Sequence, residues 1–191
     1  NFSHTFPNDI GIVLVGPTGA ALLLQSAVTL GSGSGNPASN ITYTISDSGA
    51  TRLPADSPIV SGTTYKPTAY FTGDSFPSPG PGTNYAHPGP DGGASATFSS
   101  VFGGTNPNGN WNLFIRDFVT GDSGMVSGGW TLEITTGGGG TPQAFDNRLD
   151  FFGNGFSDWI TLSAVSGGSI TWKGTRNDNP TPPASRMFRI P

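Results

Sequence analysis

The sequence predicts an all-β protein, and three observations support this fold class. Residues 111–115 and 130–134 each begin with tryptophan and carry apolar residues at every second position, as expected of a strand that buries one face. The 191 residues include 30 glycines and 17 prolines, which is typical of many turns between short strands, while 11% aromatic residues argue against disorder. No segment shows sustained helical periodicity. These features favour short strands packed around one or more cores.

The strands in the first half can be placed by the turn residues around them. The apolar segment Ile10–Val15 lies between turn-forming residues and is predicted to be a strand, with residues 20–25 as its hairpin partner. Residues 41–45 alternate cleanly and predict a further strand. Residues 46–100 are rich in Ser, Gly and Pro, so we expect mostly loop there, although a loop of this length is uncommon in a compact domain.

The second half begins with the strongest strand pattern in the chain. Residues 98–102 predict a strand that precedes a hairpin. The hairpin itself is predicted from residues 111–117 and 130–134, which the Gly/Asp-containing turn at 121–124 joins.

A flexible linker is predicted where four consecutive glycines, residues 137–140, precede Thr141 and Pro142. We place a domain boundary there. Beyond it, residues 159–162, 167–172 and 186–190 predict about three strands. A chain of 191 residues can hold one large or two small domains.

The composition excludes several classes of function. Only 10% of the residues are charged, and eight basic residues against twelve acidic ones give a net charge of −4, so we expect neither nucleic-acid binding nor a basic membrane-binding patch. No apolar run approaches the ~20 residues of a membrane helix. The absence of cysteine excludes disulfides, thiol catalysis and cysteine metal sites. The chain begins with Asn1 rather than Met, which we interpret as a processed or trimmed protein.

One short motif suggests catalysis at first sight. Residues 121–124 read Gly-Asp-Ser-Gly, which is similar to the nucleophile loop of trypsin-like proteases. A nucleophilic serine needs a histidine base held by a third group. His4 and His87 are the two histidines of the chain, and neither lies in a recognisable base motif. A turn is therefore the better interpretation, and we expect no enzymatic activity. Two histidines far apart in the sequence also make a zinc site improbable.

Five spaced segments carry a resemblance to a known family. They are Phe-Ser-His-Thr-Phe-Pro-Asn-Asp-Ile at residues 2–10 and the segments 14–19, 61–67, 76–79 and 106–111. In this order they resemble the P domain, the β-domain that follows the catalytic domain in subtilisin-like proprotein convertases, of the bacterial secreted type. The resemblance covers residues 1–136. It implies a jelly-roll-like β-sandwich, a secreted or cell-surface location, no catalytic activity, and a structural role for His4 within the sandwich.

The C-terminal part is similar to VCBS/FG-GAP-type calcium-loop repeats. Asp150, Asn154 and Asp158 match ligand positions 1, 5 and 9 of such a loop, whereas Phe152 replaces a ligand. A weak calcium site is one interpretation, and a Gly/Asn turn that enters a strand is the other. The domain organisation is thus 1–136 for the P-domain-like sandwich, 137–144 for the linker, and 145–191 for a single VCBS/FG-GAP-like unit.

A second candidate calcium site lies in the first domain. Asp9, Asp117 and Asp122 are predicted at strand ends beside turns, where carboxylate and backbone oxygens suit Ca²⁺. The resemblance implies calcium at similar acidic positions, although Gly11 stands where Asp is common in the family. The alternative is that these aspartates cap turns by accepting backbone N–H hydrogen bonds.

Two departures from these families lead to the functional hypothesis. The family usually has a strand before Ser3, which this chain almost lacks, and a single repeat cannot bury its hydrophobic face alone. We therefore expect a non-enzymatic extracellular structural module that self-associates into a filament or tube by strand complementation or edge pairing. Residues 1–6 and 186–191 are the segments expected to cross between subunits.

Two alternatives remain open. The chain is an accessory domain that stabilises or regulates the catalytic domain of a secreted subtilisin-like protease, or a calcium-dependent adhesion or glycan-binding module. Trp159 and Trp172 would belong to a core or an interface, or would form an exposed glycan platform.

Overall fold

The computed structural model confirms the all-β fold class. It describes residues 1–29 and 36–135 in full, and the backbone of the strands at residues 143–149, 157–165 and 169–175. In these parts, one short α-helix, α1 (Phe98–Phe102), and two 3-10 turns, η1 (Pro7–Asp9) and η2 (Asp91–Gly93), accompany the strands. None of the described helices is both long and apolar enough to cross a membrane.

The larger sheet has six strands in the order β13-β12-β9-β2-β3-β8. Its centre is the antiparallel set β9 (Asn110–Asp117), β2 (Ile10–Val15) and β3 (Ala21–Ser26). The short β8 (Thr68–Ala69) adds in parallel at one side. At the other side, β12 (Ser157–Val165) and β13 (Ser169–Thr175) continue the antiparallel pairing.

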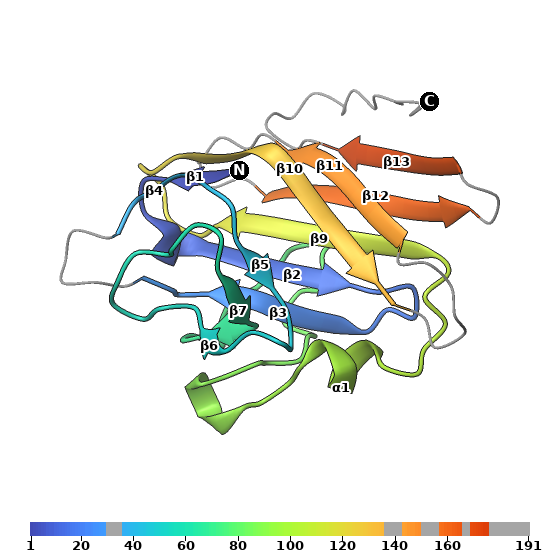
Figure 1. Cartoon of the computed structure of the whole chain (residues 1–191), viewed down its shortest axis with the longest axis horizontal. Coiled ribbons are helices and arrows are strands. Elements are labelled where there is room, and N and C mark those ends of the chain that lie inside the picture. The colour runs from blue at the N-terminus through green and yellow to red at the C-terminus, as the bar shows by residue number, and fades with distance from the viewer. Residues whose placement is uncertain (30–35, 136–142, 150–156, 166–168, 176–191) are drawn as a thin grey trace.

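The second sheet has four strands in the order β11-β10-β1-β4. It consists of β11 (Gln143–Leu149), β10 (Gly124–Ile134), β1 (Phe2–His4) and β4 (Ala38–Ile41), all antiparallel. Figure 1 shows β10 and β11 crossing over the strands of the larger sheet. A third, small parallel sheet joins β5 (Thr44–Ile45), β7 (Thr64–Lys66) and β6 (Thr51–Arg52).

The main core lies between the four-stranded and six-stranded sheets, which makes the fold a β-sandwich. The four-stranded sheet contributes Phe2, Ala38 and Val126, and the larger sheet contributes side chains such as Leu14 and Trp111. Alternate residues of β2, β3 and β9 point to the opposite face of the larger sheet, where Phe76 and Tyr85 of the loop region cover them. Burial on both faces explains why β2 reads as a continuous apolar run. The jelly-roll topology stays a prediction from the resemblance.

The predicted hairpin is wrong in its pairing, although both of its strands exist. β9 pairs with β2 and β12, whereas β10 pairs with β1 and β11 in the other sheet. The connection at residues 118–123 therefore passes from one layer of the sandwich to the other. Period-two alternation shows that a strand buries one face, but it does not say which strand is the neighbour.

The strand predicted at residues 98–102 is also wrong, because this segment forms α1. Thr97 and Ser100 make a reciprocal capping box, in which each side chain accepts a hydrogen bond from the backbone N–H of the other residue. Asp47 satisfies two more N-terminal amides, those of Phe98 and Ser99, at 2.8 Å each. These contacts provide partners for the free N–H groups of a helix start.

Two further expectations need correction in detail. The strand predicted at residues 41–45 is divided, because Ile41 ends β4 in one sheet and Thr44 begins β5 in another. The region at residues 46–100 contains β6, β7 and β8 in addition to α1, so it is less loop-like than expected. Residues 186–190, predicted as a strand, lie outside the described residues.

Candidate functional site

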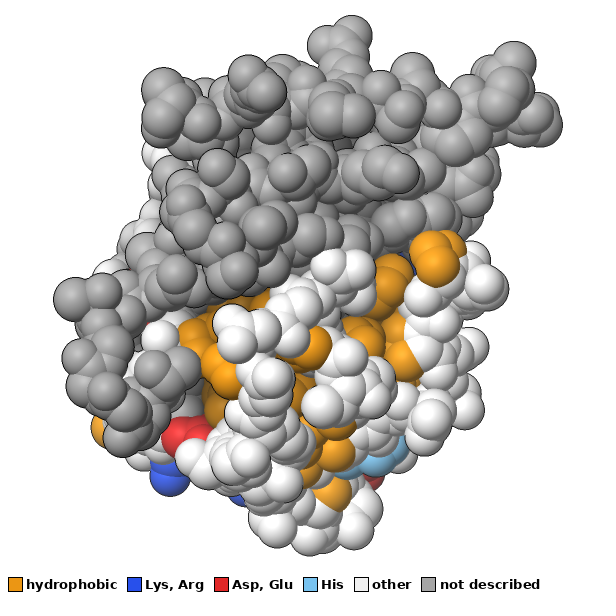
Figure 2. Space-filling model, turned by 90° about the vertical axis from the view of Figure 1, so that its right-hand side faces the viewer, with side chains coloured by type: hydrophobic (Ala, Val, Ile, Leu, Met, Phe, Trp, Pro, Cys, Tyr) orange, Lys and Arg blue, Asp and Glu red, His pale blue; other side chains and the backbone are white. Residues whose placement is uncertain are grey.

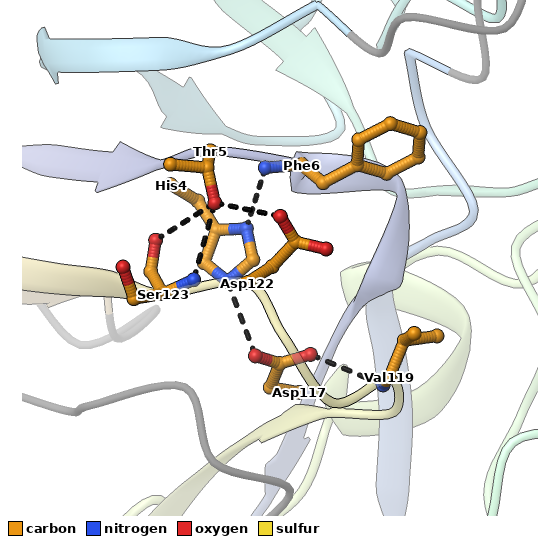
Figure 3. Close-up of polar contacts among 7 residues, drawn as sticks. All are labelled: His4, Thr5, Phe6, Asp117, Val119, Asp122 and Ser123. Carbon is orange, nitrogen blue, oxygen red and sulfur yellow. Dashed lines mark hydrogen bonds and ion pairs between the residues drawn. The ribbon is translucent and has the colours of Figure 1, made fainter.

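The most connected polar site lies where the end of β1 meets the ends of β9 and β10. His4 and Asp117, which are 113 residues apart in the sequence, are both fully buried there, and His4 Nε2 lies 3.3 Å from Asp117 Oδ2. Figure 3 shows the imidazole between the backbone of Phe6 and the Asp117 carboxylate. The pair thus connects the two layers of the sandwich at one end.

The hydrogen bonds fix the tautomer of His4. The backbone N–H of Phe6 donates to Nδ1 at 3.0 Å, so Nδ1 carries no hydrogen. Nε2 then carries the proton and donates it to Asp117. Both ring nitrogens are thereby engaged, and neither is free to act as a general base. This geometry agrees with the structural role that the family resemblance implies for His4.

The Gly-Asp-Ser-Gly turn closes this site from the side of β10. The Thr5 hydroxyl donates to Asp122 Oδ1 at 2.9 Å and accepts from the Ser123 backbone N–H at 3.1 Å. The Thr5 backbone N–H donates to the Ser123 carbonyl, also at 3.1 Å. The turn is therefore tied to the end of β1 by backbone groups of Ser123 and the carboxylate of Asp122 (Figure 3).

Asp117 and Asp122 both lie near enough to Asp9 for their charges to act on its carboxyl group. The backbone carbonyl of Asp9 accepts from the Phe118 N–H at 2.9 Å, which holds the turn after β9 beside η1. Burial, followed by the negative charges of Asp122 and Asp117, raises the pKa of Asp9 to about 6. Both effects disfavour the charged form of the Asp9 carboxyl, and the contribution of its neighbours shows that negative charge gathers at this corner.

These three aspartates do not fit a calcium site with three carboxylate ligands. Asp117 uses Oδ2 for His4 and Oδ1 for the Val119 backbone N–H at 3.2 Å, which is the turn-capping role weighed as the alternative. No group of three or more His, Cys, Asp or Glu side chains among the described residues has the geometry to hold a metal ion. Asp9 and Asp122, whose carboxyl groups are close enough for the charge of Asp122 to raise the pKa of Asp9, remain as a carboxylate pair.

The calcium loop predicted in the C-terminal part lies mostly outside the described structure. Asp150 and Asn154 are outside the described residues. Asp158 lies on β12, opposite Ile115 of β9, and its side chain is not among those described. Calcium binding at these three residues stays a prediction.

A buried acid that the sequence pattern does not reveal stands next to Gly11. A Cβ atom at Gly11 would lie 2.6 Å from Phe118 Cε2 and 2.9 Å from Asp74 Oδ2. Asp74 is 7% exposed, and burial raises its pKa, whereas Ser26 and the charge of Arg116 lower it. The Asp74 carboxylate thus lies directly beside Gly11. Asp74 comes from a loop without periodicity, so only its long-range contact identifies it.

Comparison with known proteins gives this chain no family assignment. No family model, no curated protein and no solved structure matches it.

Proposed function

We propose that this protein is a non-catalytic, extracellular structural module whose copies associate by exchanging their C-terminal strands. The observation that carries this proposal is the position of β11 and β12, which add to one edge of each layer of the sandwich. The resemblance to the P domain supports a secreted protein without its own active site. An exchange that continues from copy to copy would build a filament or tube.

The two edges need these strands. β10 pairs with β11 through six residue pairs, and β9 pairs with β12 through seven. Without them, both β9 and β10 would expose a row of unpaired N–H and C=O groups, which is a template for strands of other chains. The register of β12 also continues the row of apolar residues on β9, because Ile160 is opposite Leu113 and Leu162 is opposite Trp111.

The linker that joins residues 1–134 to the C-terminal strands β11 and β12 suits strand exchange. Residues 135–142 separate the end of β10 from the start of β11, and four of these eight residues are consecutive glycines. A glycine-rich linker is flexible, so the same strand pairs can form within one chain or between two. The N-terminal segment is a less suitable donor, since β1 is paired on both sides by β10 and β4 of its own chain.

Engineered cysteine pairs can test this exchange directly, because the natural chain has no cysteine. Asn112 of β9 is paired with Thr161 of β12, and paired Cα atoms in neighbouring strands are about 4.5–5.5 Å apart, within disulfide range. After oxidation of Asn112→Cys/Thr161→Cys, we expect disulfide-linked dimers and higher species on a non-reducing gel. Ser3→Cys/Met125→Cys, which joins β1 to β10 within the body, is the matched control and should remain a monomer.

The opposite result would favour the second candidate role. If Asn112→Cys/Thr161→Cys closes within single chains and the protein is a monomer by light scattering, the strand-exchange proposal is wrong. A monomer with its own completed sheets would instead suit an accessory domain of a secreted subtilisin-like protease.

A further inference from the structure

Two of the few basic side chains in this protein lie side by side. Residues 1–136 contain three Lys or Arg residues, which are Arg52, Lys66 and Arg116. Arg52 of β6 and Lys66 of β7 are direct partners across the two strands. Like charges at paired positions repel each other, although solvent screens the repulsion because both side chains are exposed, and an anion near both would remove it. Among the described residues, few Lys, Arg, Asp or Glu side chains are visible on the face shown in Figure 2.

Both cations line a pocket. The pocket has a volume of about 260 Å³ and lies between the small sheet and the segment that leads into α1. Pro67, Pro88 and Ala96 supply apolar walls. Its volume is just below the range of about 300–1,000 Å³ that is usual for small-molecule sites, which suits one compact ring rather than an extended chain.

The charges in the pocket leave a positive excess. Arg52 donates one hydrogen bond, to the Pro88 carbonyl at 3.0 Å, which fixes the guanidinium at the wall. Asp47, the acidic residue of the lining, accepts from two backbone amides of α1, one at each carboxylate oxygen. Among the fully described residues 1–29 and 36–135, neither cation has a carboxylate within ion-pair distance. Arg52 and Lys66 are exposed, and with Asp47 they give the lining a net charge of +1 that a bound anion could neutralise.

The backbone that surrounds the pocket is closely packed. A Cβ atom at Gly49 would lie 2.3 Å from the Tyr65 carbonyl carbon and 2.5 Å from the Lys66 N. The turn that follows Asp47 therefore contacts β7 at a distance that only glycine allows. This packing fixes the backbone of β7 beside the turn, and hydrogen bonds hold the side chains of Asp47 and Arg52 without a ligand, as in a partly preformed site.

We propose that this pocket binds an acidic monosaccharide unit, with its carboxylate or sulfate between Arg52 and Lys66. The guanidinium suits a bidentate contact with either anion, and the ammonium adds a point charge. The apolar C–H face of the sugar ring would pack on the prolines, and its hydroxyls would face the open side. This site is separate from the strand edges, so it does not depend on the self-association proposed above.

Calorimetric titration of the full chain tests the site with four probes, which are glucuronate, glucose 6-sulfate, glucose and inorganic sulfate. We expect the two acidic sugars to bind more tightly than glucose or sulfate alone, with a Kd of about 1 mM or below. Whichever of glucuronate and glucose 6-sulfate binds more tightly shows whether the site prefers a carboxylate or a sulfate. Binding of neither acidic sugar at about 10 mM, or equal binding of glucose, would overturn the proposal.

Two double variants separate site recognition from net charge. Arg52→Gln/Lys66→Gln should weaken the binding of the acidic sugar at least about tenfold. Arg148→Gln/Lys173→Gln removes the same charge from β11 and β13 and should leave binding unchanged. A cooperative thermal unfolding transition in each variant serves as the check that both are folded. Equal loss of binding in the two variants would mean that the anion senses only net charge, and the pocket assignment would be wrong.

Discussion

At the scale of single residues, the His4–Asp117 pair shows how a polar contact can be placed in a β core. Asp117 accepts from two donors, His4 Nε2–H and the Val119 N–H, one at each oxygen. Because both partners of the Asp117 carboxylate are donors, residue 117 must offer an acceptor atom to each of them. A buried polar group of this kind is stabilising only while every partner is present.

This requirement predicts the effect of Asp117→Asn. The amide NH₂ would face either the His4 Nε2–H or the Val119 N–H, so one buried donor would lose its acceptor. We expect a loss of about 1–3 kcal/mol in the free energy of unfolding, measured by urea denaturation. Asp56→Asn, at an exposed position, is the control and should change stability by less than about 0.5 kcal/mol. Equal stability of Asp117→Asn and the natural protein would show that the pair is not satisfied as described.

Asp9 gives a second prediction, which concerns pH. Its pKa is raised from 3.8 to about 6, first by burial and then by the charges of Asp122 and Asp117. Stability from this group is therefore complete below its unfolded pKa and is lost as the pH rises through about 6. Asp9→Asn should stabilise the fold above this pKa by about 1 kcal/mol, a value reduced for solvent screening at this partly exposed side chain. Near pH 4 the same substitution should have little effect.

Bound Ca²⁺ would reverse the predicted effect of Asp9→Asn on stability. If Ca²⁺ binds the Asp9–Asp122 pair, it offsets the repulsion between the carboxylates, and Asp9→Asn loses a ligand. The midpoint of thermal unfolding would then rise with Ca²⁺ in the natural protein, fall with a chelator, and respond to neither in Asp9→Asn. Without that response in the natural protein, the predicted calcium site in this domain is wrong.

At the scale of elements, the sequence predicts where strands are better than how they pair. β2, β3, β9 and β10 carry local periodicity or turn boundaries, and all four are found close to their expected positions. The partner of β10 is set by burial of Phe2, Val126 and Trp111 in a common core, which is a long-range property. α1 is missed because its start depends on Asp47, 51 residues away from Phe98. Of the candidate site, Asp9, Asp117 and Asp122 could be found from strand ends, whereas Asp74 and the Arg52–Lys66 pocket could not.

The packing between β2 and the turn after β9 predicts the effect of Gly11→Ala. The added Cβ would lie 2.6 Å from Phe118 and 3.0 Å from the Phe76 ring, so side chains on this face must move. Overpacking of this kind costs about 1–3 kcal/mol, which chemical denaturation measures. Phe118→Leu combined with Gly11→Ala should recover part of the loss, with a coupling of at least about 0.5 kcal/mol in a double-mutant cycle. Additive losses would show that Phe118 does not limit the space at Gly11.

At the scale of the whole molecule, the C-terminal strands determine whether the sandwich is complete. β12 lies between β9 and β13, and residues 159–163 are paired on both sides, so their backbone N–H groups all face a neighbouring strand. β11 covers the free side of β10 in the other layer. The tail is thus bound by main-chain hydrogen bonds in both layers, and low net charge leaves little repulsion to oppose its docking, within one copy or between two.

Cutting the linker of the intact protein tests this dependence. With a protease site in place of residues 137–140, the cleaved tail should co-elute with the body in size-exclusion chromatography and separate only in denaturant. Thr161→Pro should release the tail after cleavage, because proline removes a ladder hydrogen bond at any position of a central strand. Thr161→Val keeps the N–H and a β-branched side chain, so its tail should stay bound. Release of the tail from the unsubstituted cleaved protein would show that residues 143–175 form a separate unit, and that the sheets of residues 1–135 do not need them.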